Sequence, residues 1–167
     1  LGDVGYRQIL ERHHRVIRAE LRRHGGIEVD TAGDGFFATF EGPARAIECA
    51  LGICEGVRPL GIEVRAGVHT GEVEIIDGKV GGLGVHIGSR VSAAAAPSEV
   101  LVSSTVKDLV AGSGLVLEDA GEQELKGVSD RWRLYRVAVD PGGENEAVTI
   151  SPAESYLPKC LRSAHDR

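Results

Sequence analysis

The spacing of apolar residues changes several times along the 167-residue chain, and this change most restricts its fold. From about residue 6 to 24 the apolar side chains recur every three or four positions, which predicts a helix with one buried face. Residues 27–29 and 36–40 are short apolar runs on either side of a polar, glycine-containing turn, which predicts a hairpin. Pro43 then begins a second helix, because proline at the first helical position gives up only an unpaired N–H.

The apolar pattern keeps changing beyond residue 60. Residues 62–68 alternate apolar and polar side chains, which predicts a strand with one covered face. A glycine-rich link over 81–84 leads into a helix over about 85–96. The remaining expected elements are strands at 73–76, 100–102, 115–117, 124–125 and 132–139 and a short helix at 104–110. Helices that alternate with hairpins over one sheet predict an α+β sandwich rather than a doubly wound parallel sheet.

Length and composition narrow the classes of function. The chain is long enough for about one domain, and its 19 basic and 25 acidic residues give a formal net charge of −6. This balance disfavours nucleic acid polymers and anionic membrane surfaces as partners. No apolar run approaches the ~20 residues that cross a bilayer. Three cysteines do not form a disulfide framework, so we expect reduced thiols and a cytoplasmic protein.

The composition shifts at residue 140 toward proline, glycine, glutamate and serine. We therefore divide the chain into a folded domain over 1–139 and a polar C-terminal tail over 140–167.

Asp34 lies among small residues in the expected hairpin turn, where glycines let a ligand approach the backbone. A carboxylate in such a turn can coordinate Mg²⁺, a hard cation that takes oxygen ligands and is commonly shared with substrate phosphates. Aspartate is also frequent in turns for purely structural reasons. On spacing alone, the structural interpretation is the stronger of the two.

His86 and Arg90 are four residues apart in the helix expected after the glycine-rich link, so they share a face. A histidine and an arginine directed to one point suit a polyphosphate, because arginine presents a fixed fork of donors and keeps its charge. Lys126 precedes a glycine near the end of an expected strand, where an ammonium can reach a phosphate. Each of these signals is weak by itself.

Several other kinds of site are not supported. His13 and His14 are adjacent, so on a helix they do not face each other, and no histidine has the spacing of a zinc ligand. No glycine-serine-glycine elbow supports a serine nucleophile. The glycine-rich link lacks the lysine of a P-loop and the spacing of a dinucleotide fold.

Taken together, five segments in order resemble the catalytic domain of class III nucleotidyl cyclases, especially actinobacterial and mycobacterial adenylate cyclases. The resemblance covers about residues 1–138, and the combination is far more specific than any single motif. The segments are GGIEVDTAGDGFFATFEGPARAIECAL, GIEVRAGVHTGEVE, GVHIGSRV, SEVLVSSTVKDLVAGSGL and GEQELKGVSDRWRLYRV.

The resemblance implies a ferredoxin-like α+β domain that works as a head-to-tail homodimer with its sites at the interface. It implies cyclisation of a nucleoside triphosphate to a 3′,5′-cyclic monophosphate and pyrophosphate, with two divalent ions, Mg²⁺ or Mn²⁺. Asp34 then matches the second metal-binding aspartate. Arg90 matches the arginine that stabilises charge at the α-phosphate, and His86 stands where many members have an asparagine. Lys126 matches the lysine that holds the terminal phosphates.

Two departures from the family pattern stand out. The opening strand and first metal-binding aspartate should precede Leu1, and Asp3 falls too late to replace them. Either the sequence lacks a segment that the protein possesses or the domain has lost a metal ligand, and we favour the first. The base-reading positions are also exchanged: Asp30 stands where adenine-specific members have lysine, and Lys79 where they have aspartate.

The favoured interpretation is a cytoplasmic homodimeric adenylate cyclase acting on ATP. One alternative is a catalytically weak cyclase-homology module with a regulatory or dimerisation role, and another is a cyclase with relaxed or GTP preference. A diguanylate cyclase is disfavoured because its signature sequence does not occur.

Overall fold

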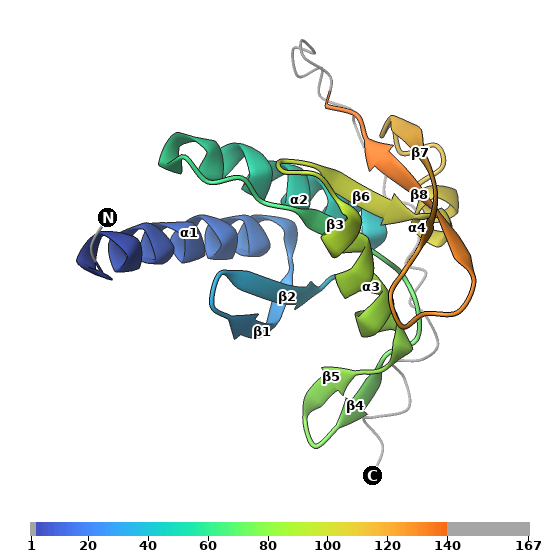
Figure 1. Cartoon of the computed structure of the whole chain (residues 1–167), viewed down its shortest axis with the longest axis horizontal. Helices are drawn as coiled ribbons and strands as arrows, with labels where there is room; N and C mark the ends of the chain where they lie inside the picture. The colour runs from blue at the N-terminus through green and yellow to red at the C-terminus, as the bar shows by residue number, and fades with distance from the viewer. Residues whose placement is uncertain (1–2, 140–167) are drawn as a thin grey trace.

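Residues 3–139 of the computed structural model are described here; they alternate helices with strands along the whole sequence (Figure 1). The elements in chain order are α1 (Asp3–His24), β1 (Ile27–Ala32), β2 (Gly35–Thr39), α2 (Pro43–Val57), the 3-10 helix η1 (Arg58–Leu60), β3 (Ala66–Val68), β4 (Glu74–Ile76), β5 (Lys79–Gly81), α3 (Leu83–Ala94), β6 (Val100–Ser103), α4 (Ser104–Leu109), β7 (Leu117–Glu124) and β8 (Arg131–Val137). None of the described helices is long and apolar enough to span a bilayer.

A four-stranded sheet in the order β3–β6–β8–β7 forms the centre of the domain. Strands β3 and β6 are parallel, whereas β8 runs antiparallel to both β6 and β7. Strands β1 and β2 form one separate antiparallel hairpin, and β4 and β5 form another. The arrangement confirms the predicted mixed α+β fold.

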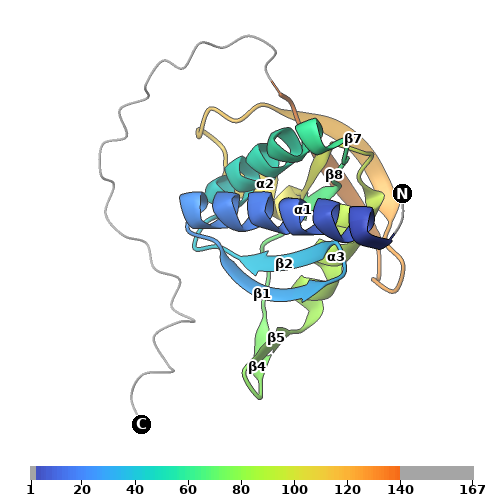
Figure 2. The same ribbon diagram turned by 90° about the vertical axis from the view of Figure 1, so that its left-hand side faces the viewer.

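Helices cover both faces of the four-stranded sheet. Val100 and Val102 of β6 pack in one cluster with the apolar face of α2 and with α4, whereas Leu101 between them packs in another with α3. Side chains alternate between the faces of a strand, so β6 must be covered on both sides to bury all four of its residues. Helix α1 packs instead on α2 and β2, as Figure 2 shows, with Ile17 and Leu21 in its own small cluster.

Gly67 lets α3 lie close against β3. A Cβ at this position would be 2.2 Å from the backbone nitrogen of Ser92, so any larger residue would force the helix away from the sheet. This close approach fixes the height of α3 above the sheet, and with it the positions of His86 and Arg90.

The structure confirms the predicted helices and differs from the predicted strands in three places. The strand expected over 62–68 is limited to β3, and β5, which ends at the first glycine of the link over 81–84, was not expected. The segments expected at 115–117 and 124–125 belong to one strand, β7, whose middle is polar because it lies at the edge of the sheet. The predicted tail over 140–167 lies outside the described residues.

Candidate functional site

The two-residue turn Gly33–Asp34 joins β1 to β2 and presents Asp34 to solvent. Ala32 pairs with Gly35, so the turn is shorter than the polar turn over 30–35 that the sequence suggests. Gly33 has a φ of +62°, and a Cβ built on it would meet nothing within 4 Å. Within residues 3–139 the Asp34 carboxylate forms no hydrogen bond or ion pair, so its oxygens are available to a ligand.

Two neighbouring histidines of α1 contact the backbone of this turn. Nε2 of His13 lies 3.0 Å from the carbonyl oxygen of Asp34, and Nε2 of His14 lies 2.8 Å from that of Gly33. These contacts could not be predicted from local patterns, because the residues they join are about 20 positions apart. Within the described residues, no three histidine, cysteine, aspartate or glutamate side chains are placed to hold a metal ion together.

Helix α3 positions His86 and Arg90 one turn apart. Ile87 and Val91 on the same helix are buried against the sheet, which fixes the rotation of the helix about its axis. Both His86 and Arg90 are half-buried. The Arg90 Nε atom is buried and has no hydrogen-bond partner in the described part of the chain.

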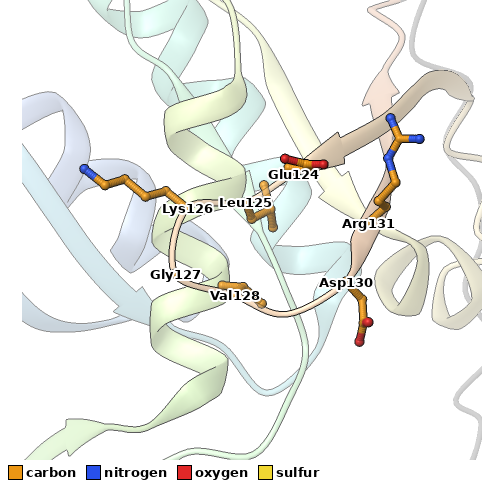
Figure 3. Close-up of a pocket in the computed structure, with 7 residues that line it drawn as sticks. All are labelled: Glu124, Leu125, Lys126, Gly127, Val128, Asp130 and Arg131. Carbon is orange, nitrogen blue, oxygen red and sulfur yellow. The ribbon is translucent and has the colours of Figure 1, made fainter.

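The turn between β7 and β8 carries Lys126 and places the neighbouring Gly127 against His86. Gly127 has a φ of +77°, and a Cβ there would lie 3.2 Å from Nε2 of His86. This turn borders an open depression of about 550 Å³, in which Lys126 extends away from Asp130 and Arg131 (Figure 3). The depression is lined by residues of the β7–β8 turn, and His86 lies against the same turn at Gly127.

His69 directly follows the last residue of β3. Its Nδ1 atom is 2.8 Å from Oγ of Ser103, and its ring lies edge-on to Trp132. Burial lowers the pKa of His69 because the imidazolium would lose hydration there. The sequence analysis did not single out this residue, which packs next to α3 at Gly88.

The exchanged base-reading residues lie on the two hairpins. Asp30 is exposed in β1, where one carboxylate oxygen accepts a hydrogen bond from the Thr31 amide at 2.9 Å. Lys79 is exposed at the start of β5. No ion pair joins Asp30 and Lys79 within residues 3–139, and none joins Asp34 to Arg90 or Lys126.

The predicted residues thus lie in three places in one chain. Asp30 and Asp34 lie on the β1–β2 hairpin, and Lys79 lies on β5. His86 and Arg90 lie on α3, which approaches the Lys126 turn at Gly127.

A family comparison identifies the fold that these groups occupy. Residues 4–139 match the model of the adenylate and guanylate cyclase catalytic domain. The chain belongs to this family. The match spans all the described elements, and it includes every residue that the sequence analysis assigned to the site.

Solved structures agree with the cyclase assignment. An adenylate/guanylate cyclase/hydrolase from Silicibacter pomeroyi is 28% identical and superposes with a TM-score of 0.72, over 83% of this chain and 85% of the other. The adenylyl cyclase CyaB from P. aeruginosa also gives a TM-score of 0.72 at 18% identity, over 84% and 85% of the two chains. The cyclase domain therefore has the class III fold.

Sequence relatives are considerably longer than this cyclase domain. A protein of Rhizobium meliloti named putative adenylate cyclase 3 is 26% identical, over 75% of this chain and 25% of its own length. An uncharacterized protein of Mycobacterium tuberculosis is 32% identical, over 69% of this chain and 41% of its own length.

The residues of the cyclase domain fit a divalent cation only in part. The exposed Asp34 carboxylate and the open space around Gly33 suit a hard cation that takes its other ligands from phosphate and water. Asp34 would hold such an ion as one protein ligand.

Proposed function

We propose that this domain is an adenylate cyclase that converts ATP to 3′,5′-cyclic AMP and pyrophosphate as a homodimer. The observation that carries this proposal is the buried Nε of Arg90, which has no partner within residues 3–139, in a domain of the cyclase family. A buried guanidinium donor without an acceptor costs free energy unless an anion binds it. An α-phosphate is the anion that this family's reaction supplies.

Each residue would then have a distinct task. Arg90 would bind the α-phosphate, where its fixed fork of donors stabilises charge that develops as the ribose 3′-oxygen attacks. Lys126 would bind the terminal phosphates, and His86 beside it would hold the reacting part of the nucleotide in line. Asp34 would hold one of two divalent ions, Mg²⁺ or Mn²⁺, which when bound activate the attacking oxygen and shield the phosphates.

The β4–β5 hairpin supports assembly of two chains. It projects from the rest of the domain (Figure 1), and apolar side chains along it are exposed instead of buried. These residues are Ile75 and Ile76 in β4, with Val73 and Leu83 on either side of the hairpin. A second copy would cover this surface and would bring the acidic hairpin of one chain to the cationic residues of the other.

Asp30 and Lys79 would read the base. Adenine offers an acceptor at N1 and a donor at its 6-amino group, so Lys79 would donate to N1 and Asp30 would accept from the amine. A GTP-specific or relaxed cyclase is the second candidate, because the exposed Asp30 carboxylate could equally accept from N1–H and the 2-amino group of guanine.

We further propose that residues 1–139 are the catalytic domain and 140–167 a tail. We place the protein in the cytoplasm, where the free thiols of Cys49 and Cys54 stay reduced.

The test is release of cyclic nucleotide from the intact protein with Mn²⁺ and either ATP or GTP. We expect cyclic AMP to form from ATP, and Asp34→Asn to abolish most of it, while Asp108→Asn on α4 serves as a matched surface control. Nucleotide binding without release of any cyclic nucleotide would contradict the proposed enzymatic activity. It would favour a catalytically weak cyclase-homology module with a regulatory role.

The same assay with Asp30→Lys and Lys79→Asp measures base preference. A change in the ratio of ATP to GTP turnover in either variant supports the assignment, whereas an unchanged ratio in both removes these residues from base recognition.

A further inference from the structure

Two consecutive side chains of α1 hydrogen-bond two consecutive carbonyl groups of the turn that presents Asp34. His13 contacts the carbonyl of Asp34 itself, and His14 contacts that of Gly33, at 3.0 and 2.8 Å. A carbonyl oxygen can only accept a hydrogen bond, so Nε2 must bear the proton in both rings. The geometry therefore fixes the same tautomer for both histidines.

His13 is the more deeply placed of the two. Only 3% of its surface is exposed, and its second ring nitrogen, Nδ1, is buried without a hydrogen-bond partner within residues 3–139. An unpaired buried polar atom is destabilising, and an apolar side chain of similar size would fill this space without that cost. What histidine provides here, and an apolar residue could not, is the hydrogen bond to the turn.

His14 makes a similar bond in a different setting. Its contact with Gly33 is solvent-exposed, and its ring packs edge-on against Phe36, with centroids 4.9 Å apart. An exposed hydrogen bond competes with water and contributes less than a buried one. His14 is therefore a natural control for His13, because it contacts the same turn from the same helix.

We propose that His13 is a positioning residue that fixes the Asp34 turn so that the carboxylate is held ready for the metal-bound triphosphate. The consequence for binding of the metal and the triphosphate rests on the proposed function, whereas the hydrogen bond from His13 to the turn does not. His13 acts through the backbone of Asp34 and does not touch the nucleotide.

The local construction of the hairpin explains why such a contact would matter. β1 and β2 pair only with each other within the described residues. The apolar residues that anchor them to α1 and α2 are Phe36 and Ala38 in β2 and Phe40 directly after it. The turn itself has no apolar anchor, since Gly33 and Asp34 are both exposed. A displacement of about 1 Å in a reacting group can cost on the order of 100-fold in rate.

The experiment compares four variants of the full chain. His13→Leu removes the donor, His13→Gln keeps an amide N–H near the position of Nε2, and His13→Asn has a donor too short to reach. His14→Leu is the matched control. Hydrogen–deuterium exchange of a peptide covering residues 31–36 reports the turn directly. Electron paramagnetic resonance of Mn²⁺ with 3′-deoxy-ATP, which cannot cyclise, reports metal affinity without turnover.

We expect His13→Leu and His13→Asn to speed exchange in this peptide by about tenfold, the factor associated with one lost buried hydrogen bond. We also expect both to weaken Mn²⁺ binding and to lower kcat more than they raise KM for ATP. His13→Gln should restore most of each property, and His14→Leu should change each by less than about threefold. If His13→Leu does not fold, the comparison of Gln with Asn still decides the matter.

Unchanged exchange of the turn in His13→Asn would overturn the proposal, as would equal effects of the Gln and Asn variants. Faster exchange with unchanged Mn²⁺ affinity would also overturn it, provided that Asp34→Asn does weaken Mn²⁺ binding. If Asp34→Asn leaves Mn²⁺ binding unchanged, the assigned role of Asp34 fails. The positioning role then fails with it, while the exchange data alone show whether His13 holds the turn.

Discussion

The four-stranded sheet and the two separate hairpins of this domain are built by different means. In the sheet, residues such as Val102 and Leu134 are completely buried between helices on both faces. In the hairpins, β4 is exposed along its whole length, and β1 is buried only in part. Sheet and helices could be stable in one chain, whereas the hairpins have surfaces that a single chain leaves uncovered.

This contrast bears on the proposed chemistry. His86 and Arg90 belong to α3, which is packed on the sheet, whereas Asp34, Asp30 and Lys79 belong to the hairpins. The cationic half of the site would therefore be rigid in each chain. The acidic half would depend on smaller contacts, including those of the histidines, and on assembly with a second chain.

The largest effect is expected from a cavity in the sheet. Leu134 is fully buried in β8, so Leu134→Ala should lower the free energy of unfolding by about 2–5 kcal/mol, from lost burial and the cavity that remains. Chemical denaturation measures this change. In the monomer, Ile75→Ala in the β4–β5 hairpin, where the side chain is 69% exposed, should change it by no more than about 0.5 kcal/mol. Equal losses of unfolding free energy in the two variants would contradict the difference between the sheet and the hairpins.

Removal of the half-buried Arg90 side chain should affect catalysis without affecting the fold. We expect Arg90→Ala to lower kcat by about 100- to 1000-fold, the range found when one preorganised donor to a developing charge is lost. Steady-state assays with ATP and Mn²⁺ measure it, and circular dichroism confirms folding. Lys107→Ala, on α4 at the opposite face of the sheet, is the control and should retain activity.

A charge on the projecting hairpin should weaken assembly. Ile75→Asp places a carboxylate on the apolar surface of β4, so we expect the dissociation constant of the dimer to rise about tenfold or more, as for a buried interface residue. Sedimentation at several concentrations measures it. Leu109→Asp, an exposed apolar residue on α4, should leave association unchanged. A dimer unaffected by Ile75→Asp would place the interface elsewhere.

The sequence predicted those parts of the fold in which local pattern and tertiary packing agree. Helices α1, α2 and α3 have a clear apolar face, and the Asp34 turn was recognised from its small residues. Strand β5 was missed although a signal existed: Asp77 and Gly78 have positive φ angles of 51° and 75° in a two-residue turn, and Asp-Gly is a typical hairpin sequence. Strand β7 was divided because an edge strand needs few apolar residues.

The contacts of the candidate site were less predictable. Helical periodicity places His13 on the inner face of α1, but nothing local states that a hairpin turn 21 residues away lies against it. The approach of Gly127 to His86 likewise joins segments that are far apart in sequence. Such contacts follow from how the elements pack together. Residue type could suggest the chemistry of the site, but only the fold could bring its members together.

The smallest effect is expected at the ion pair between α1 and β1. Arg18 donates two hydrogen bonds of 2.8 Å to the Glu28 carboxylate, and these bonds, with one from the Thr31 hydroxyl, lower the pKa of Glu28 to about 2. A carboxyl pKa that is lower in the folded state than in the unfolded state stabilises the fold at pH values above the ordinary pKa. This contribution is lost as the pH falls through about 2. Carbon-13 NMR of the Glu28 carboxyl should therefore show a midpoint near 2.

In Arg18→Gln the midpoint of Glu28 should move up toward its ordinary value of 4.5, because the first and largest cause of the shift is gone. By linkage, the unfolding free energy at neutral pH should fall only as far as this midpoint rises, and the solvent around the exposed pair limits both changes. A midpoint that stayed near 2 in this variant would mean that Arg18 does not hold β1 to α1. The hairpin would then rest on its apolar contacts and on the two histidines alone.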